Sequence, residues 1–219
     1  MPGKLFSSPR ILLVVLVLLL GVSATVWALL PAQPSHRVGL IPAAPSRGSM
    51  QPIIPAPQFS FPDQDDQPLT TQSLKGKVWI ADFIFTHCGN TCPRMTAQRV
   101  ELQKKITDPR VMFLSISVDP ERDDRATRKT YASEKHIDES RWKFVSPPDH
   151  AAALKIAQAM RVAAVTPNAK NQDPILHSDR FVLIDSGARI RGTYPLDDPA
   201  SMDRLIADAL AFANDATGK

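Results

Sequence analysis

Two cysteines stand close together in the segment Cys88-Gly89-Asn90-Thr91-Cys92, and the 219-residue chain contains no other cysteine. A buried strand is expected to end at about Phe85 and a helix to begin at about Cys92, so the pair lies between a strand and a helix. The N–H groups and the dipole at a helix start stabilise thiolate. Thiolate attacks disulfides and binds soft metal ions, so this placement indicates a functional pair.

Three residues separate Cys88 from Cys92, one more than the usual dithiol spacing. If both lie in the first helical turn, residues i and i+4 share a face, with Cβ atoms roughly 5–6 Å apart. That separation suits two sulfurs sharing one metal ion, with Cu(I) favoured first and Zn second. It also permits a disulfide after a slight movement, since oxidised pairs need Cβ atoms at about 3.8 Å. A purely structural disulfide is less favoured, because closing so short a loop stabilises by only about 2 kcal/mol.

Two thiolates alone leave a metal exposed, so a third ligand is expected, and histidine is the natural candidate. Three of the five histidines lie on a proline-rich stretch or among surface charges: His36, His136 and His150. His87 is expected at an extended strand end, where its side chain points away from that of Cys88. His177 precedes a late strand, and in a thioredoxin-like sheet that loop faces the cysteine loop. The alternative for His177 is a loop histidine without a ligand role.

The elements that position these residues follow from apolar runs and helical periodicity. Strands are expected at Lys77–Phe85, Val111–Val118, Trp142–Ser146, Phe181–Asp185 and Arg189–Tyr194, the last two as a hairpin around Ser186-Gly187-Ala188. Helices are expected at 92–106, Asp123–His136, Asp149–Met160 (capped by Asp149) and Met202–Ala213. Strand, helix, strand, helix, then a hairpin and a helix is the order of an α/β, thioredoxin-like domain.

An uncharged apolar segment of 20 residues, 11–30, precedes this domain and is long enough to cross a bilayer as a helix. Lys4 and Arg10 lie before it, so residues 1–10 are expected in the cytoplasm and the remainder across a bacterial inner membrane, in the periplasm. A cleaved signal peptide is the alternative. Residues 31–57 contain seven prolines and predict an extended linker. The expected domain spans 58–213, with a tail at 214–219.

Composition excludes several classes of protein. The chain is 43% apolar and 22% charged, which excludes a wholly disordered protein. Its formal charge of +4 falls to about +2 beyond the membrane segment, too little for nucleic-acid binding. Two cysteines exclude a disulfide-rich scaffold and a four-cysteine zinc module.

Three blocks together resemble the Sco (SenC) family of copper-site assembly proteins. The blocks are DFIFTHCGNTCPRMTAQ, Ser117-Val118-Asp119-Pro120-Glu121-Arg122-Asp123 and His177-Ser178, and the likeness spans roughly residues 58–213. The resemblance implies a thioredoxin-like fold that binds copper through Cys88, Cys92 and His177. It further implies copper delivery to, or thiol reduction at, the binuclear copper site of cytochrome c oxidase subunit II, with other exported copper chaperones or thiol reductases as partners.

The chain departs from the family pattern in two places. Gly89-Asn90-Thr91 stands where Pro-Asp is common, and Ile175-Leu176 replaces the usual Val-Asp before the histidine. The loss of that acidic neighbour leaves the orientation of His177 open. Asp119 resembles the family's acidic position near the site and is taken as a supporting residue; its alternative role is capping the helix that follows.

Three function hypotheses follow. The leading one is a membrane-tethered copper chaperone, which does not turn over. The second is an enzyme, a thiol–disulfide oxidoreductase acting on exported partner cysteines, which needs the dithiol but not His177. A peroxidase is disfavoured, because Cys88-Gly89-Asn90-Thr91 matches a glutathione peroxidase motif only loosely.

Overall fold

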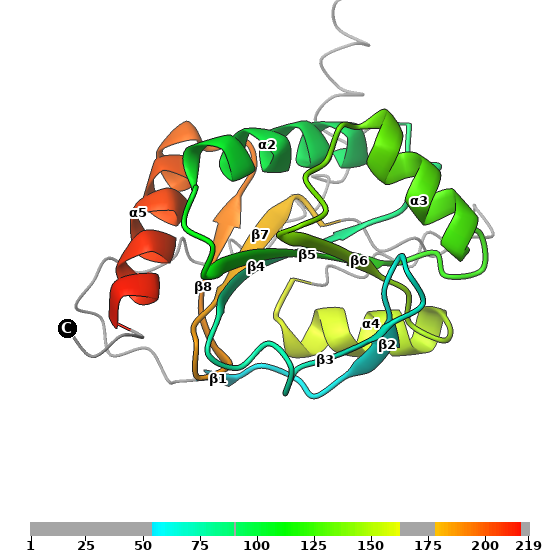
Figure 1. The fold of residues 1–219 in the computed structure, drawn as a ribbon, viewed down its shortest axis with the longest axis horizontal. Coiled ribbons are helices and arrows are strands. Elements are labelled where there is room, and N and C mark those ends of the chain that lie inside the picture. Colours follow the sequence, from blue (N-terminus) through cyan, green and yellow to red (C-terminus); the bar gives the residue numbers. More distant parts are fainter. Residues whose placement is uncertain (1–53, 90, 163–177, 216–219) are drawn as a thin grey trace, which may run out of the picture. The chain divides into compact units, whose positions relative to one another are not determined.

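A six-stranded sheet forms the centre of the computed structural model, which describes residues 54–89, 91–162 and 178–215 (Figure 1). Its strand order is β1-β8-β7-β4-β5-β6, and β2 and β3 form a separate hairpin. The strands are β1 Ile54–Pro55, β2 Ser60–Pro62, β3 Pro68–Thr70, β4 Val78–Ile84, β5 Val111–Ser117, β6 Trp142–Val145, β7 Arg180–Ile184 and β8 Arg189–Pro195. The helices are α2 Thr91–Lys105, α3 Arg125–Glu134, α4 His150–Ala159 and α5 Pro199–Asp215.

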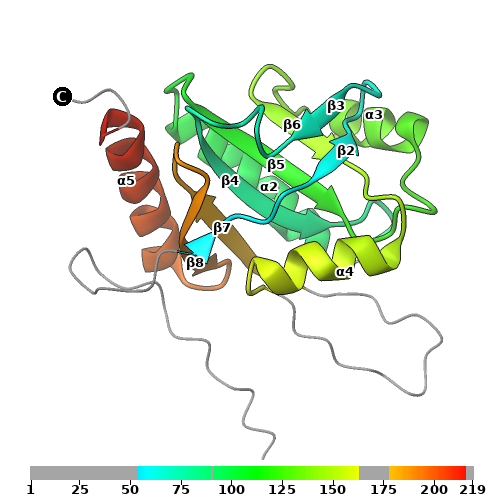
Figure 2. The same cartoon turned by 90° about the horizontal axis from the view of Figure 1, so that it is seen from below.

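Strands β4 and β5 are the middle of the sheet, and all seven residues of each are buried. They run parallel, as do β5 and β6, and parallel neighbours need a crossover. Helices α2 and α3 supply the two crossovers over one face of the sheet, while α4 lies over the other (Figures 1 and 2). This is the thioredoxin-like α/β arrangement that the order of elements predicts. It places the cysteine loop directly after the carboxyl end of β4.

The β7–β8 hairpin brings a distant part of the chain to the same edge of the sheet. Strand β7 is antiparallel to β4, with Trp79, Ile80 and Ala81 opposite Ile184, Leu183 and Val182. The beginning of β7 therefore lies beside the end of β4. At the predicted turn, the Asp185 carboxylate accepts the backbone N–H groups of Gly187 and Arg189, both at 3.0 Å.

Helix caps explain where α3 and α4 begin. Asp149 accepts the N–H of Ala152 at 2.7 Å, so the predicted cap of α4 is confirmed. Asp124 does the same for Thr127 at 2.8 Å, and α3 consequently begins at Arg125, two residues later than the sequence suggests.

Three short strands at the start of the domain, β1 to β3, are not predicted by the sequence pattern. Strand β1 lies in the stretch that proline content assigns to the linker, yet Ile54 pairs with Ile190 of β8. Buried side chains connect the β2–β3 hairpin to distant segments of the chain. Gln64 accepts the N–H of Phe144 at 2.9 Å, and Arg128 donates to the carbonyl of Pro62 at 3.0 Å. Contacts between segments far apart in the chain produce no periodic pattern in the local sequence, so these strands could not be predicted from it.

The proposed membrane segment 11–30 lies outside the described residues, as do most of the linker and residues 216–219. Within 54–89, 91–162 and 178–215, no helix has the length and apolar character needed to cross a bilayer.

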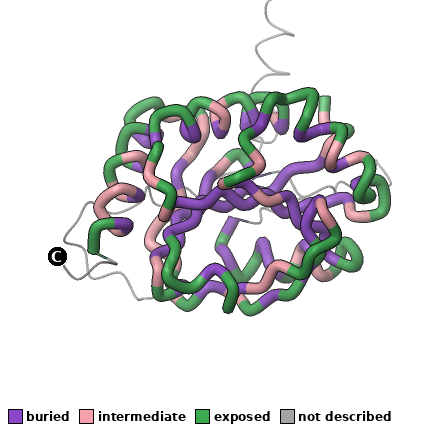
Figure 3. Tube along the Cα trace, in the orientation of Figure 1, coloured by how far each residue is buried: buried purple, intermediate pink, exposed green. Residues whose placement is uncertain are grey.

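The central strands are buried (Figure 3), and an ion pair lies among the buried residues beneath α2. Arg99 donates from Nε and Nη2 to the Asp82 carboxylate at 2.9 and 2.6 Å, and both side chains are 1% exposed. Ser115 donates to the other Asp82 oxygen at 2.7 Å, and the guanidinium lies 5.1 Å from the ring centre of Trp142. The pair therefore joins α2 to β4, β5 and β6.

Replacing Arg99 by methionine is expected to lower the free energy of unfolding by about 3–5 kcal/mol, because the Asp82 carboxylate is left buried without its partner. The double variant Asp82→Leu with Arg99→Met removes both charges and is expected to recover most of that loss. Urea unfolding of the reduced protein measures both. Equal losses in the single and double variants would show that the ion pair is not the source of the effect.

Candidate functional site

The cysteine loop leaves β4 through a tight turn. The N–H of Cys88 donates to the carbonyl of Phe85 at 3.3 Å, so residues 85–88 form the turn and α2 begins soon after, at Thr91. The Cys88 sulfur in turn accepts the N–H of Cys92, at 3.3 Å. The two cysteines thus meet at the start of α2, although Cys88 lies in the preceding turn and not in the first helical turn as the i, i+4 prediction assumes. The helix start donates directly to the Cys88 sulfur.

The two thiols differ in exposure and in acidity. Cys88 is half-buried, whereas Cys92 is only 6% exposed and packs in the core. Burial raises the pKa of the Cys92 thiol well above its usual range, and the adjacent Cys88 side chain raises it further. A helix-terminal N–H favours negative charge on Cys88. Cys88 is therefore the outer, more readily ionised sulfur, and Cys92 the inner, protonated one.

A buried carboxylate fixes the turn from below. Asp123, at 0% exposure, accepts the backbone N–H and the hydroxyl of Thr86 at 3.1 and 2.6 Å and the hydroxyl of Ser117 at 2.6 Å. These bonds connect the turn of β4 to the end of β5. Asp123 ends one of the blocks that resemble the Sco family, but the sequence assigns it no role of its own. That role follows from the parallel pairing of β4 and β5, which brings it under Thr86.

Asp119, the predicted supporting residue, is buried near the end of β5 and does not cap α3. Its carboxylate accepts Arg122 Nε at 2.5 Å, and His150 Nε2 lies 3.9 Å from its other oxygen. His150, predicted to be a solvated surface residue, thus stands at the start of α4 beside a buried carboxylate, with about half of its side chain exposed.

His177, the predicted third ligand, lies outside the described residues. It precedes the start of β7 by three residues, and that strand begins beside the end of β4. Among residues 54–89, 91–162 and 178–215, no three His, Cys, Asp or Glu side chains cluster closely enough to hold a metal ion. Within these described residues the two sulfurs meet without a third such side chain clustered beside them.

His87 differs from its expectation. It belongs to the turn at residues 85–88 and not to an extended strand end, so the alternation of side chains along a strand does not apply to it. Its ring is exposed, and Nδ1 lies 3.0 Å from the hydroxyl oxygen of Thr86.

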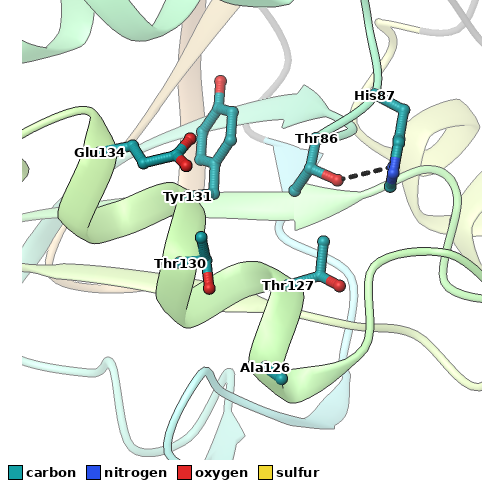
Figure 4. Close-up of a pocket in the computed structure, with 7 residues that line it drawn as sticks. All are labelled: Thr86, His87, Ala126, Thr127, Thr130, Tyr131 and Glu134. Atoms are coloured by element: carbon teal, nitrogen blue, oxygen red, sulfur yellow. Dashed lines mark hydrogen bonds between the residues drawn. The ribbon is translucent and has the colours of Figure 1, made fainter.

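A groove of about 340 Å³ opens beside the cysteine loop (Figure 4). The loop forms one wall and α3 forms the other. The lining residues are Thr86, His87, Ala126, Thr127, Thr130, Tyr131 and Glu134. Burial raises the pKa of Tyr131 to about 12, and its hydroxyl lies 2.6 Å from that of Thr96 on α2.

Fold and site together define a thioredoxin-like domain with a dithiol between its central strand and the following helix. The model of the SCO1/SenC family matches residues 49–212, and the chain belongs to that family. A SCO1 protein homolog of Bacillus subtilis is 32% identical over 152 residues, which are 68% of this chain and 78% of the relative.

Two solved structures extend the comparison. BsSco, described as a member of the Sco family of cytochrome c oxidase assembly proteins with a disulfide switch, is 30% identical with a TM-score of 0.64, over 75% of this chain and 96% of that one. ScoI of Bradyrhizobium japonicum, solved with copper bound, is 29% identical with a TM-score of 0.58, over 73% of this chain and 99% of that one.

The asymmetry of the thiols predicts that iodoacetamide at neutral pH modifies Cys88 at least about tenfold faster than Cys92, because a one-unit difference in pKa already changes the thiolate fraction tenfold. Peptide mass spectrometry after short exposures measures the two rates. The same reaction in urea is the control, since unfolding should equalise them. Equal rates in the folded protein would contradict the assigned order of the two sulfurs.

Proposed function

We propose that the chain is a membrane-anchored copper chaperone that binds copper through Cys88, Cys92 and His177. Its role is to assist assembly of the binuclear copper site of cytochrome c oxidase subunit II. The anchor is residues 11–30 and the domain acts in the periplasm of a bacterium. When oxidised, the two cysteines form a disulfide, and other exported copper chaperones or thiol reductases are its further partners.

The observation that carries the proposal is the 3.3 Å contact between the Cys92 N–H and the Cys88 sulfur. It brings two soft donors to one helix start, with one sulfur facing out and the other facing in. Two sulfurs select Cu(I) over harder ions. The copper-bound ScoI structure and the oxidase-assembly description of BsSco support copper as the cargo and the oxidase as its destination.

The third ligand in this proposal is His177, and the strand pairing supports that choice. The pairing of β4 with β7 brings the start of β7 to the edge from which the cysteine loop leaves, and His177 is three residues from that start. Asp119, with its partners Arg122 and His150, follows the end of β5 and is carried as the supporting residue of this proposal.

Titration of the reduced chain with Cu(I) is expected to reach one copper per molecule, and Cys88→Ser or Cys92→Ser is expected to abolish tight binding. His177→Ala should retain the two sulfurs and bind at least about tenfold more weakly. Competition with a chromophoric Cu(I) chelator measures each affinity. Affinity that is unchanged in His177→Ala would refute the three-ligand site.

Copper affinity is expected to rise with pH across the neutral range. The pKa of the Cys92 thiol is raised, so this thiol is protonated when the metal arrives and copper must displace that proton. Each unit of pH should therefore tighten the apparent Kd about tenfold for this one thiol, and by more where Cys88 is also protonated. The same competition assay at several pH values measures the slope. A pH-independent Kd would show that Cys92 is not a ligand.

The thiol asymmetry also favours a second candidate, a thiol–disulfide oxidoreductase. Cys88 would attack a partner disulfide and Cys92 would resolve the mixed disulfide, because exchange needs an exposed thiolate and a nearby second thiol. Disulfide reduction that persists in His177→Ala, in a chain with no measurable copper affinity, would favour this enzyme over the chaperone.

A further inference from the structure

Thr86 links the exposed ring of His87 to a buried carboxylate. The Thr86 hydroxyl lies 2.6 Å from Asp123 Oδ1 and 3.0 Å from His87 Nδ1. Asp123 is fully buried, and its second oxygen accepts the hydroxyl of Ser117 at 2.6 Å. The hydrogen bond from Ser117 of β5 thus holds the Asp123 carboxylate in place, and Thr86 connects that carboxylate to the imidazole of His87.

The hydrogen-bond partners of Thr86 determine which nitrogen of the His87 ring carries a hydrogen. A carboxylate accepts hydrogen bonds and donates none, so the single hydroxyl hydrogen of Thr86 points to Asp123. The Thr86 oxygen then faces Nδ1 with a lone pair, and Nδ1 must carry the hydrogen. In neutral imidazole the other nitrogen, Nε2, consequently carries a lone pair. A metal-binding histidine is typically held in this way by a second partner behind it.

The Nε2 lone pair of His87 is placed where it could bind a metal ion close to the cysteines. His87 immediately precedes Cys88, the outer sulfur, and its side chain is exposed. It also lines the groove of about 340 Å³, whose other wall is formed by α3 side chains that include Thr127, Thr130 and Glu134 (Figure 4). Glu134 is the only carboxylate among the residues that line this groove, and neither Lys nor Arg is among them, so its negative charge favours a cation there.

We infer that His87 is a transit ligand for copper: Nε2 receives Cu(I) at the groove and passes it to the Cys88 sulfur. The inference rests on the proposed copper function and goes beyond it. It adds a ligand that binds copper during loading but does not remain bound in the final site. Imidazole binds copper, but two thiolates hold Cu(I) better, so the metal moves inward.

The exchange conserves charge and electrons. A bond from copper to the donor molecule's ligand breaks as the bond to Nε2 forms, and the Nε2 bond breaks after the Cys88 thiolate has bound. Copper stays Cu(I) throughout. The Cys92 thiol releases its proton to solvent when its sulfur joins, and His87 returns to the neutral ring bonded to Thr86.

The test measures loading rate and final affinity separately, on the full reduced chain with the Cu(I) complex of bicinchoninate as the copper source. Stopped-flow absorbance follows the loss of that complex, and competition at equilibrium gives the Kd. His87→Gln is expected to slow loading at least about tenfold while the Kd stays within about twofold. Thr86→Val, which removes the hydroxyl behind the ring, should slow loading by a smaller factor, and Thr86→Ser should restore it.

His136→Asn is the matched control, because His136 is also an exposed histidine and its φ of 53° is a conformation that asparagine tolerates. It is expected to load at the wild-type rate. Loading of His87→Gln at the wild-type rate would overturn the inference and leave the proposed chaperone intact. A Kd weakened by the same factor as the rate would also overturn it, since His87 would then be a permanent ligand. A wild-type chain that takes no copper from the complex would overturn both proposals.

Discussion

The hydrogen bond from the Cys92 N–H to the Cys88 sulfur is the contact on which the site depends. It places the outer sulfur at the start of α2, where unpaired N–H groups and the helix dipole stabilise negative charge. It also separates the sulfurs by environment, because Cys92 continues into the helix and is buried against the sheet. One outer thiolate and one inner thiol are what both copper capture and disulfide exchange require.

The rest of the sheet edge holds this contact in place. Asp123 fixes the turn through Thr86, and Asp119 joins the end of β5 to the start of α4 through His150. Beneath the helix, the pair of Arg99 and Asp82 connects α2 to the central strand. A buried ion pair is weak evidence for stability, but breaking one partner is costly, so it resists sliding or rotation of the helix that carries Cys92. The loop is therefore supported from the sheet and from the helix.

Most of the fold follows from local patterns in the sequence. The two central strands are predominantly apolar runs, the start of α4 is marked by Asp149, and the β7–β8 turn is marked by Ser186-Gly187-Ala188. The cysteine pair is also visible in the sequence, because it stands between a predicted strand and a predicted helix. These features depend on neighbours in the chain, which is why composition and periodicity reveal them.

Features that depend on distant contacts could not be predicted. Strand β1 is short and contains proline, and only its pairing with β8 makes it a strand. The role of Asp123 arises because parallel pairing brings the end of β5 under Thr86. The sequence predicts His87 at an extended strand end, but it lies in a turn. The Phe85–Cys88 hydrogen bond and the contact of Asp123 with Thr86 fix that turn. Each case needed tertiary geometry.

X-ray absorption at the copper edge of the Cu(I)-loaded, full-length protein tests the central claim most directly, because it counts the atoms bound to the metal. The account predicts two sulfur neighbours and one nitrogen neighbour, with the nitrogen lost in His177→Ala and kept in His87→Gln. A first shell of sulfur alone, or one without sulfur, would contradict it.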